Sequence, residues 1–316
     1  MKKTSALLLL ILLLVSRSEA TTWDEPWADD VLAKASSFVL AKVTSNDEAK
    51  GITIHVLKTL GGQELKGELL VNDFYLLNLC SSSGHGVEFQ IAPTDSCYFF
   101  LSRNKEGKYC IATPTTGFSP VFQGSVAATY RHSYHKALVP VGIYEKTMTA
   151  LFRNYHNLPY DKVYMTDFIN EYLNKTPASI DGPERSTFFL QHVALESVHH
   201  LKINVKDSQV LPFLNDKENF HSQVSAARAM VVFNTPSGKQ QLLKIVNDTT
   251  QNNFVQVMCI WTLGTFSPKE LKPQLEKSAR SASDESEGFG GNIMDPRVCT
   301  HIPSVKGALN DLISKL

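Results

Sequence analysis

The sequence VLPFLND, at residues 210–216, returns as LLKIVND at residues 242–248. The two stretches lie 32 positions apart, and the surrounding segment, residues 192–268, repeats at the same offset. The matching positions are Leu211 with Leu243, Leu214 with Val246, Asn215 with Asn247, Ala194 with Ala226, and Pro236 with Pro268. A repeat of this length is typical of stacked helix pairs, because each pair buries its apolar face only against its neighbours. The pattern predicts an α-solenoid-like repeat domain over residues 184–316.

Helical spacing of the apolar residues predicts the members of this array. Leu190, Ala194, Val198 and Leu201 form one stripe on a first long helix. We expect further helices at residues 209–214, 220–233, 238–246, 254–263 and 268–279, then a surface loop at 281–291 and a capping helix at 303–316. The repeats resemble HEAT-like and armadillo-like units, although those usually have about 40–47 residues.

The chain between residues 36 and 113 has the period of strands instead. Residues 52–57 alternate between apolar and polar, residues 38–43 are apolar on both sides, and shorter apolar runs occupy 69–74, 97–101 and 108–113. The last two runs flank NKEG at residues 104–107, which is typical of a hairpin turn. Five short strands after a helix at residues 27–35 predict a small Greek-key β-barrel of the OB type. The expected fold class is therefore α+β in two parts, a barrel followed by the helical repeats.

Three runs in this half resemble the netrin-like, or tissue-inhibitor-of-metalloproteinase-like, barrel of secreted proteins. They are ADDVLAKASSFVLAKVTS at residues 28–45, ITIHVLKTL at 52–60 and CYFFLSRNKEGKYCIATP at 97–114. The resemblance covers about residues 27–121. It implies that fold, but inhibitors of this family chelate the protease zinc through an N-terminal cysteine. The mature chain would begin at Thr21, so the resemblance does not extend to the inhibitory group.

The first twenty residues have the pattern of a signal peptide. Lys2 and Lys3 precede an apolar run at residues 6–15, and Ser18-Glu19-Ala20 places small residues at the cleavage positions. We expect cleavage after Ala20 and export to an extracellular or periplasmic space. The predicted organisation is a signal peptide (1–20), a barrel domain (21–125), a connecting helical segment (126–183) whose residues 174–183 read as a linker, and the repeat domain (184–316).

The charge balance restricts the partners. The chain has 31 Lys and Arg residues against 31 Asp and Glu residues. This balance argues against nucleic acid, whose binders carry a basic excess. No further stretch reads as a membrane span, so we expect none in the mature chain.

All five cysteines fall after the signal peptide, and their odd number leaves at least one thiol unpaired. The favoured disulfide joins Cys80 to Cys97, and closing a loop of this length is worth about 3 kcal/mol. The alternative is that Cys80, Cys97 and Cys110 are all buried thiols. Cys259 is interpreted as a packed thiol, with a bond to Cys299 as its alternative.

Two groups of histidines were considered as metal sites. His192, Glu196 and His199 share one face of the first long helix and could hold a metal ion, although their order differs from H-E-x-x-H. His132 and His135 lie three positions apart without a third ligand nearby. The favoured interpretation of the first group is a solvated or packed helix face. That of the second group is a connecting segment without a metal.

No nucleophile elbow, phosphate-binding loop or dinucleotide fingerprint occurs in the sequence. We therefore predict an exported, non-catalytic binding protein that presents the repeat surface to a protein or peptide, without a cofactor. The first alternative is a metal-dependent enzyme that uses His192, Glu196 and His199. The second is a protease inhibitor that acts through the barrel. The sequence specifies neither the partner nor the oligomeric state.

Overall fold

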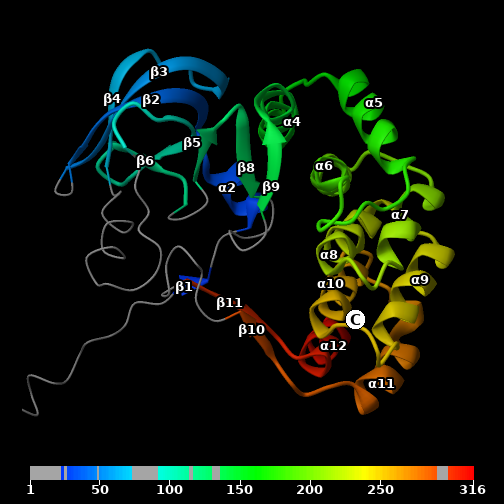
Figure 1. Cartoon of the computed structure of the whole chain (residues 1–316). Coiled ribbons are helices and arrows are strands. Elements are labelled where there is room, and N and C mark those ends of the chain that lie inside the picture. The colour runs from blue at the N-terminus through cyan, green and yellow to red at the C-terminus, as the bar shows by residue number, and fades with distance from the viewer. Residues whose placement is uncertain are drawn as a thin grey trace, which may run out of the picture.

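The computed structural model describes residues 23–24, 27–47, 50–72, 92–113, 117–129, 136–289 and 298–316. The predicted signal peptide, Thr21, Cys80, His132 and His135 lie outside these residues. In the described part the chain is an α+β fold, with a sheet at one end and a succession of helices that leads away from it (Figure 1).

Eight antiparallel strands form the sheet. Their order is β4-β3-β2-β5-β7-β8-β9, and β6 pairs with β5 beside this row. The strands are β2 (Ser37–Asp47), β3 (Gly51–Gly62), β4 (Gly67–Val71), β5 (Ser96–Arg103), β6 (Tyr109–Ile111), β7 (Phe118–Phe122), β8 (Ser125–Thr129) and β9 (Lys136–Pro140). Within the described strands, β4 and β9 end the row without pairing to each other, so the sheet is open. The predicted closed five-stranded barrel is wrong.

The sheet extends beyond the five predicted strands because β7 and β8 form a hairpin after them. Val121 pairs with Val126 and Phe122 with Ser125. The two residues between them, Gln123 and Gly124, both have positive φ, at 48° and 76°. Two such residues make a tight hairpin turn whose twist matches that of the strands. The Gly, Pro and Ser content of residues 117–125 therefore marks a turn between strands.

Strand β5 and the first residues of β2 are buried on both faces, as the apolar pattern of residues 38–43 predicted for β2, but Lys42 is exposed and β3 is exposed at alternate residues such as His55 and Leu57. Val39, Val43 and Phe99 lie in a core that the curled sheet encloses. Phe38 and Phe100, on the opposite face, stack with ring centroids 4.5 Å apart. This opposite face packs against α4 (Val141–Tyr155), so the sheet separates a small core from a much larger one.

Ten α-helices are described, and those after residue 184 lie close to the predicted positions. They are α2 (Ala28–Lys34), α4, α5 (Lys162–Leu173), α6 (Arg185–Leu201), α7 (Asp207–Leu214), α8 (Phe220–Ala229), α9 (Pro236–Val246), α10 (Asn253–Gly264), α11 (Lys272–Ser281) and α12 (Val305–Ser314). Asn215 and Asn247, which match across the repeat, are the C-caps of α7 and α9. Pro236 begins α9, where its missing N–H is tolerated.

These helices follow the sheet and do not form a separate solenoid, so the predicted two-part fold class is wrong. One apolar cluster runs from Phe38 in the sheet through Phe152 on α4 to Leu312 on α12. Helix α4 packs against β3, β8 and β9, and α6 packs against β9 (Figure 1). The reason is that α4 buries Tyr144 and Phe152 beside the sheet and also contacts α6, so its apolar face belongs to both parts of the chain. The predicted linker at residues 174–183 is tied to α6, where the Gln191 side chain accepts from the backbone N–H of Ala178 at 2.9 Å.

A second, three-stranded sheet joins the two ends of the chain. Its order is β1 (Trp23–Asp24), β11 (Val298–Ile302), β10 (Glu287–Phe289), and β1 runs parallel to β11. Strand β10 falls in the segment that was expected to be a surface loop. Over the residues that the structure describes, none of the helices has the length and apolar character needed to cross a membrane.

Candidate functional site

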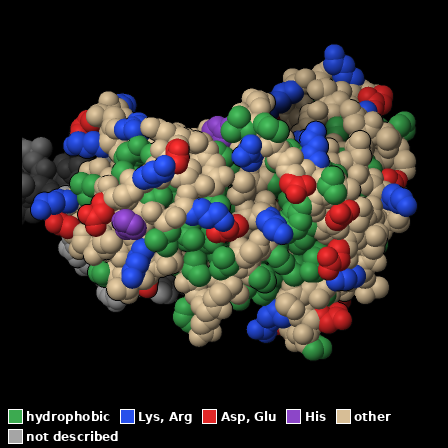
Figure 2. Space-filling model, turned by 90° about the horizontal axis from the view of Figure 1, so that it is seen from above, with side chains coloured by type: hydrophobic (Ala, Val, Ile, Leu, Met, Phe, Trp, Pro, Cys, Tyr) green, Lys and Arg blue, Asp and Glu red, His purple; other side chains and the backbone are tan. Residues whose placement is uncertain are grey.

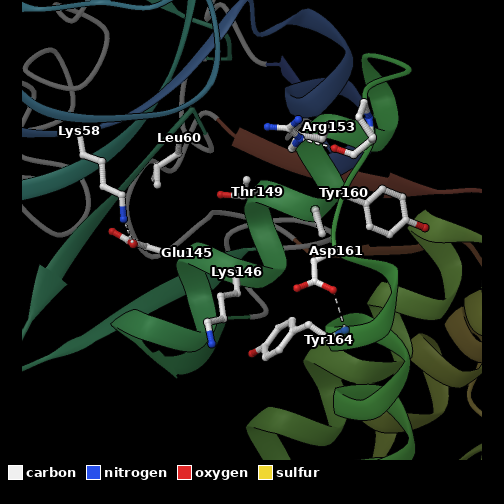
Figure 3. Close-up of a pocket in the computed structure, with 11 residues that line it drawn as sticks. Lys58, Leu60, Glu145, Lys146, Thr149, Arg153, Tyr160, Asp161 and Tyr164 are labelled. Carbon is white, nitrogen blue, oxygen red and sulfur yellow. Dashed lines mark hydrogen bonds and ion pairs between the residues drawn. The ribbon is translucent and has the colours of Figure 1, made fainter.

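A cleft of about 630 Å³ opens between β3, α4 and the start of α5 (Figure 3). The cleft exists because β3 is longer than β4. Strand β3 pairs with β4 only from Ile52 to Val56. The rest of β3 continues beside α4 and contributes Lys58 and Leu60 to the cleft. The other side chains come from α4, from the short connection after it and from the first turn of α5: Glu145, Lys146, Thr149, Ala150, Arg153, Pro159, Tyr160, Asp161 and Tyr164.

The two carboxylates of the cleft are engaged by the protein itself. Glu145 accepts from the Lys58 ammonium at 2.6 Å and from the Tyr98 hydroxyl at 3.1 Å. Burial and the negative charge of Glu145 raise the pKa of Tyr98 well above its usual range, so this hydroxyl stays a donor. Asp161 caps α5 by accepting from the backbone N–H of Tyr164 at 2.9 Å.

The cationic side chains of the cleft are held at its wall. The Lys146 ammonium lies 4.6 Å from the centre of the Tyr164 ring, which points toward it (Figure 3). Arg153 donates through Nε to the carbonyl of Pro159. The lining therefore has three cations, Lys58, Lys146 and Arg153, against two carboxylates. A ligand in the cleft would contact apolar and aromatic side chains and a lining with one more positive than negative charge.

Apolar surface continues past the rim. Leu158 and Val163, which flank the lining residues in sequence, are 42% and 72% exposed. In the view from above, hydrophobic side chains gather in the middle of this face, with Lys and Arg side chains beside them (Figure 2). Exposed apolar area of this kind is typical of surfaces that bind a partner.

A second group of functional side chains lies where α2, α4, α6 and α8 meet. Arg228 on α8 donates to Asp29 on α2 at 3.0 Å and to Glu196 on α6 at 3.2 Å. Asp29 also accepts from the Tyr155 hydroxyl at 2.6 Å, and Tyr155 contacts His200 Nδ1 at 2.9 Å. The Arg228 guanidinium lies over the Trp27 ring, 4.9 Å from its centre. We call Asp29, Tyr155, Glu196, His199, His200 and Arg228 the polar cluster.

The pKa values of the polar cluster follow from burial and from Arg228. Burial and the positive charge of Arg228 lower the pKa of His199 to about 4, although Asp29 opposes this shift. Burial lowers the pKa of His200 to about 3. Burial disfavours the charge of Asp29, but interactions with His199, His200 and Arg228 outweigh it and hold the pKa of Asp29 well below its usual range. At neutral pH the imidazoles are therefore neutral and Asp29 is ionised.

The structure separates the residues of the predicted helix-face site. His192 is buried on α6, one turn before Glu196, and its Nδ1 lies 2.8 Å from the Ser225 hydroxyl. Glu196 is buried and bonded to Arg228. His199 instead lies with His200 and Asp29, and one ligand atom from each of these three falls within 4.8 Å of the others.

Several of these residues were missed in the sequence. Asp29 was assigned to the barrel, far from the helices, and no local pattern indicates that it contacts residue 228. His200 had a signal, because it directly follows a histidine already singled out. The cleft had none, since its lining is spread over residues 58–164. Cys97 is buried on β5 with a pKa raised by burial to about 12, and its pairing with Cys80 stays a prediction.

No family model matches the chain, no curated protein matches it, and no solved structure matches it.

Proposed function

We propose that this exported protein is a non-catalytic binding protein, and that it binds a short peptide segment of a partner protein in the cleft between β3, α4 and α5. The observation that carries the proposal is the cleft itself, whose volume of about 630 Å³ lies within the roughly 300–1,000 Å³ typical of ligand sites.

The charges favour a segment with a carboxylate. Glu145 and Asp161 are engaged by protein donors, so they are poorly placed to receive a cationic ligand. Lys146 and Arg153 stand on the α4 wall, where an acidic side chain could reach them (Figure 3). Charge complementarity of this kind selects partners and speeds their association.

The apolar lining favours an aliphatic or aromatic side chain next to that carboxylate. Leu60, Ala150 and Pro159 form apolar wall, and Tyr160 and Tyr164 add rings. The exposed Leu158 and Val163 extend this surface beyond the cleft, which supports a peptide segment of a larger partner over an isolated small molecule. This junction of sheet and helices replaces the repeat surface that was proposed from the sequence.

Selection from a displayed peptide library on the purified mature protein tests the proposal. We expect enriched peptides to share an acidic residue beside an aliphatic or aromatic one. Lys146→Glu should lower their recovery at least about tenfold, because it places a carboxylate against the incoming one.

Lys105→Glu is the matched control. Lys105 is exposed on the β5–β6 turn and does not line the cleft, so this variant has the same change of charge. Recovery should match wild type. Peptides that bind Lys146→Glu as well as wild type would overturn the proposal, as would a library that yields no enriched sequence.

A further inference from the structure

The geometry of the polar cluster points to a site for a divalent transition metal ion, zinc in the first place, with Asp29, His199 and His200 as its protein ligands. This site is separate from the cleft and does not depend on the proposed function. Two imidazoles and a carboxylate are ligands that zinc accepts.

The spacing of the ligand atoms fits an ion better than direct hydrogen bonds. Asp29 Oδ1 lies 3.5 Å from His199 Nε2 and 3.6 Å from His200 Nδ1. Both distances exceed the roughly 2.7–3.2 Å of an ordinary N–H···O bond. Two atoms that bind one zinc ion tetrahedrally, each at about 2.0–2.1 Å, lie about 3.4 Å apart. The observed separations are close to this value.

The tautomer of His199 is set for metal binding. Its Nδ1 lies 3.1 Å from the carbonyl oxygen of Arg228, which can only accept, so Nδ1 carries the proton. In the neutral ring, the lone pair of Nε2 then faces the carboxylate of Asp29. A cation between Nε2 and this carboxylate would attract both. A ligating histidine typically donates its other N–H to a backbone carbonyl in this manner.

The ring of His200 has a carboxylate on its other side, at a longer distance. Its Nε2 lies 3.8 Å from Glu196 Oε2, and both side chains are fully buried. When His200 binds through Nδ1, the ring proton moves to Nε2 and points toward this carboxylate. Without metal the Tyr155 hydroxyl bridges two of the ligand atoms, since it donates to Asp29 Oδ1 at 2.6 Å and lies 2.9 Å from His200 Nδ1, and it must give up both contacts when the ion binds.

The charge and access of the polar cluster also suit a cation. Asp29 brings a carboxylate to the same point as the two imidazoles, a donor set that suits a transition metal ion. The Asp29 side chain is 41% exposed and that of His199 is 17% exposed, which leaves an entry path. The other carboxylate oxygen of Asp29 is held by Arg228 at 3.0 Å, and this contact fixes the direction of Oδ1.

Titration of the metal-free mature protein with zinc chloride, followed by calorimetry, tests the site. We expect one ion per chain in wild type. Asp29→Asn and His199→Ala should each weaken zinc binding by at least the roughly 10–100-fold typical of changes in the outer shell of such sites. Zinc should raise the melting temperature of wild type, and magnesium should not, because nitrogen ligands suit zinc and not magnesium.

His55→Ala and the double variant His132→Ala/His135→Ala are the controls. His55 is exposed on β3 and remote from the polar cluster in sequence. Both controls should bind zinc as wild type does. The absence of one-to-one binding, unchanged affinity in Asp29→Asn and His199→Ala, or loss of binding in the His132/His135 variant would each overturn the assignment. His199→Ala keeps the Asp29–Arg228 ion pair and should therefore stay folded. Weaker zinc binding in this variant then reports the missing ligand and not a loss of structure.

Discussion

Arg228 on α8 donates a hydrogen bond of 3.0 Å to Asp29 on α2, a residue 199 positions earlier in the chain. The same guanidinium lies over Trp27, and Trp27 in turn meets Trp261 on α10 edge to face, with ring centroids 6.2 Å apart. The first described helix is thereby fixed to helices of the repeat segment. This relationship gives the sheet and the helices a shared polar junction in addition to their shared core.

Removal of Arg228 should be strongly destabilising. Glu196 is fully buried and bonded to Arg228, so Arg228→Met leaves a buried carboxylate without its cation. We expect the free energy of unfolding to fall by about 3–5 kcal/mol in urea titrations. Lys217→Met is the matched control, because its ion pair with Asp248 is largely exposed and should contribute about 0–1 kcal/mol. Equal losses in the two variants would contradict this assignment.

Alanine substitutions at Gly61 on β3 and Gly142 on α4 should have opposite effects on stability. A Cβ on Gly61 would come within 2.5 Å of the Phe152 ring, so Gly61→Ala should destabilise by about 1–3 kcal/mol through overpacking. Gly142 lies on α4, and a Cβ added there would have no atom within 4 Å. Because alanine favours a helix more than glycine does, Gly142→Ala should stabilise the protein by about 0.5–1 kcal/mol. Thermal melts of the two variants give the comparison. A Gly61→Ala protein as stable as wild type would show that α4 does not press against the strand.

The sheet and the helices should unfold as one unit. The apolar cluster crosses residue 184 without a break, and α6 packs on β9. We expect one cooperative urea transition, detected equally by far-ultraviolet circular dichroism and tryptophan fluorescence. Fragments 21–183 and 184–316 should each fail to fold. Two separate transitions, or a folded fragment 184–316, would support the independent repeat domain instead.

The Cys259 thiol should be inert in the folded protein and should make stability fall at alkaline pH. Burial raises its pKa well above the usual range. An unfolded thiol loses its proton near pH 9 while the folded one keeps it, so the stabilisation is complete below about pH 9 and is lost above it. Unfolding free energy should fall more steeply between pH 9 and 11 in wild type than in Cys259→Ala. Parallel curves, or alkylation of native Cys259 at pH 8, would show that the thiol is accessible.

Local features of the fold were readable in the sequence, whereas long-range ones were not. The repeat predicted the helices well, because Asn215, Asn247 and Pro236 act on their own helix ends. The apolar pattern along residues 38–43 likewise predicted a strand with apolar residues on both faces, and it holds except at Lys42, which is exposed. The closed barrel was wrong because nothing local shows that β7–β9 extend the sheet instead of completing a ring. The separate solenoid was wrong for a similar reason, since the apolar residues of α4 do not reveal that they join two halves.

The candidate sites divide in the same way. His199 was singled out by helical spacing, and the structure places it in the polar cluster. Its proposed companion His192 was not brought there, because the partner of His199 is Asp29 from the opposite end of the chain. Asp29 on α2 and His199 on α6 meet only through tertiary packing. The spacing of residues along one helix cannot predict such a contact.

The central claim is that the cleft between β3, α4 and α5 binds an acidic peptide segment, and a double-mutant cycle tests it most directly. Affinity is measured for wild type and Lys146→Glu, each with a selected peptide and with the same peptide whose acidic residue is replaced by lysine. The account predicts that each single charge reversal weakens binding and that the double reversal restores it, with a coupling energy of about 1 kcal/mol or more. Strictly additive effects would show that the acidic residue does not meet Lys146, and would contradict the account.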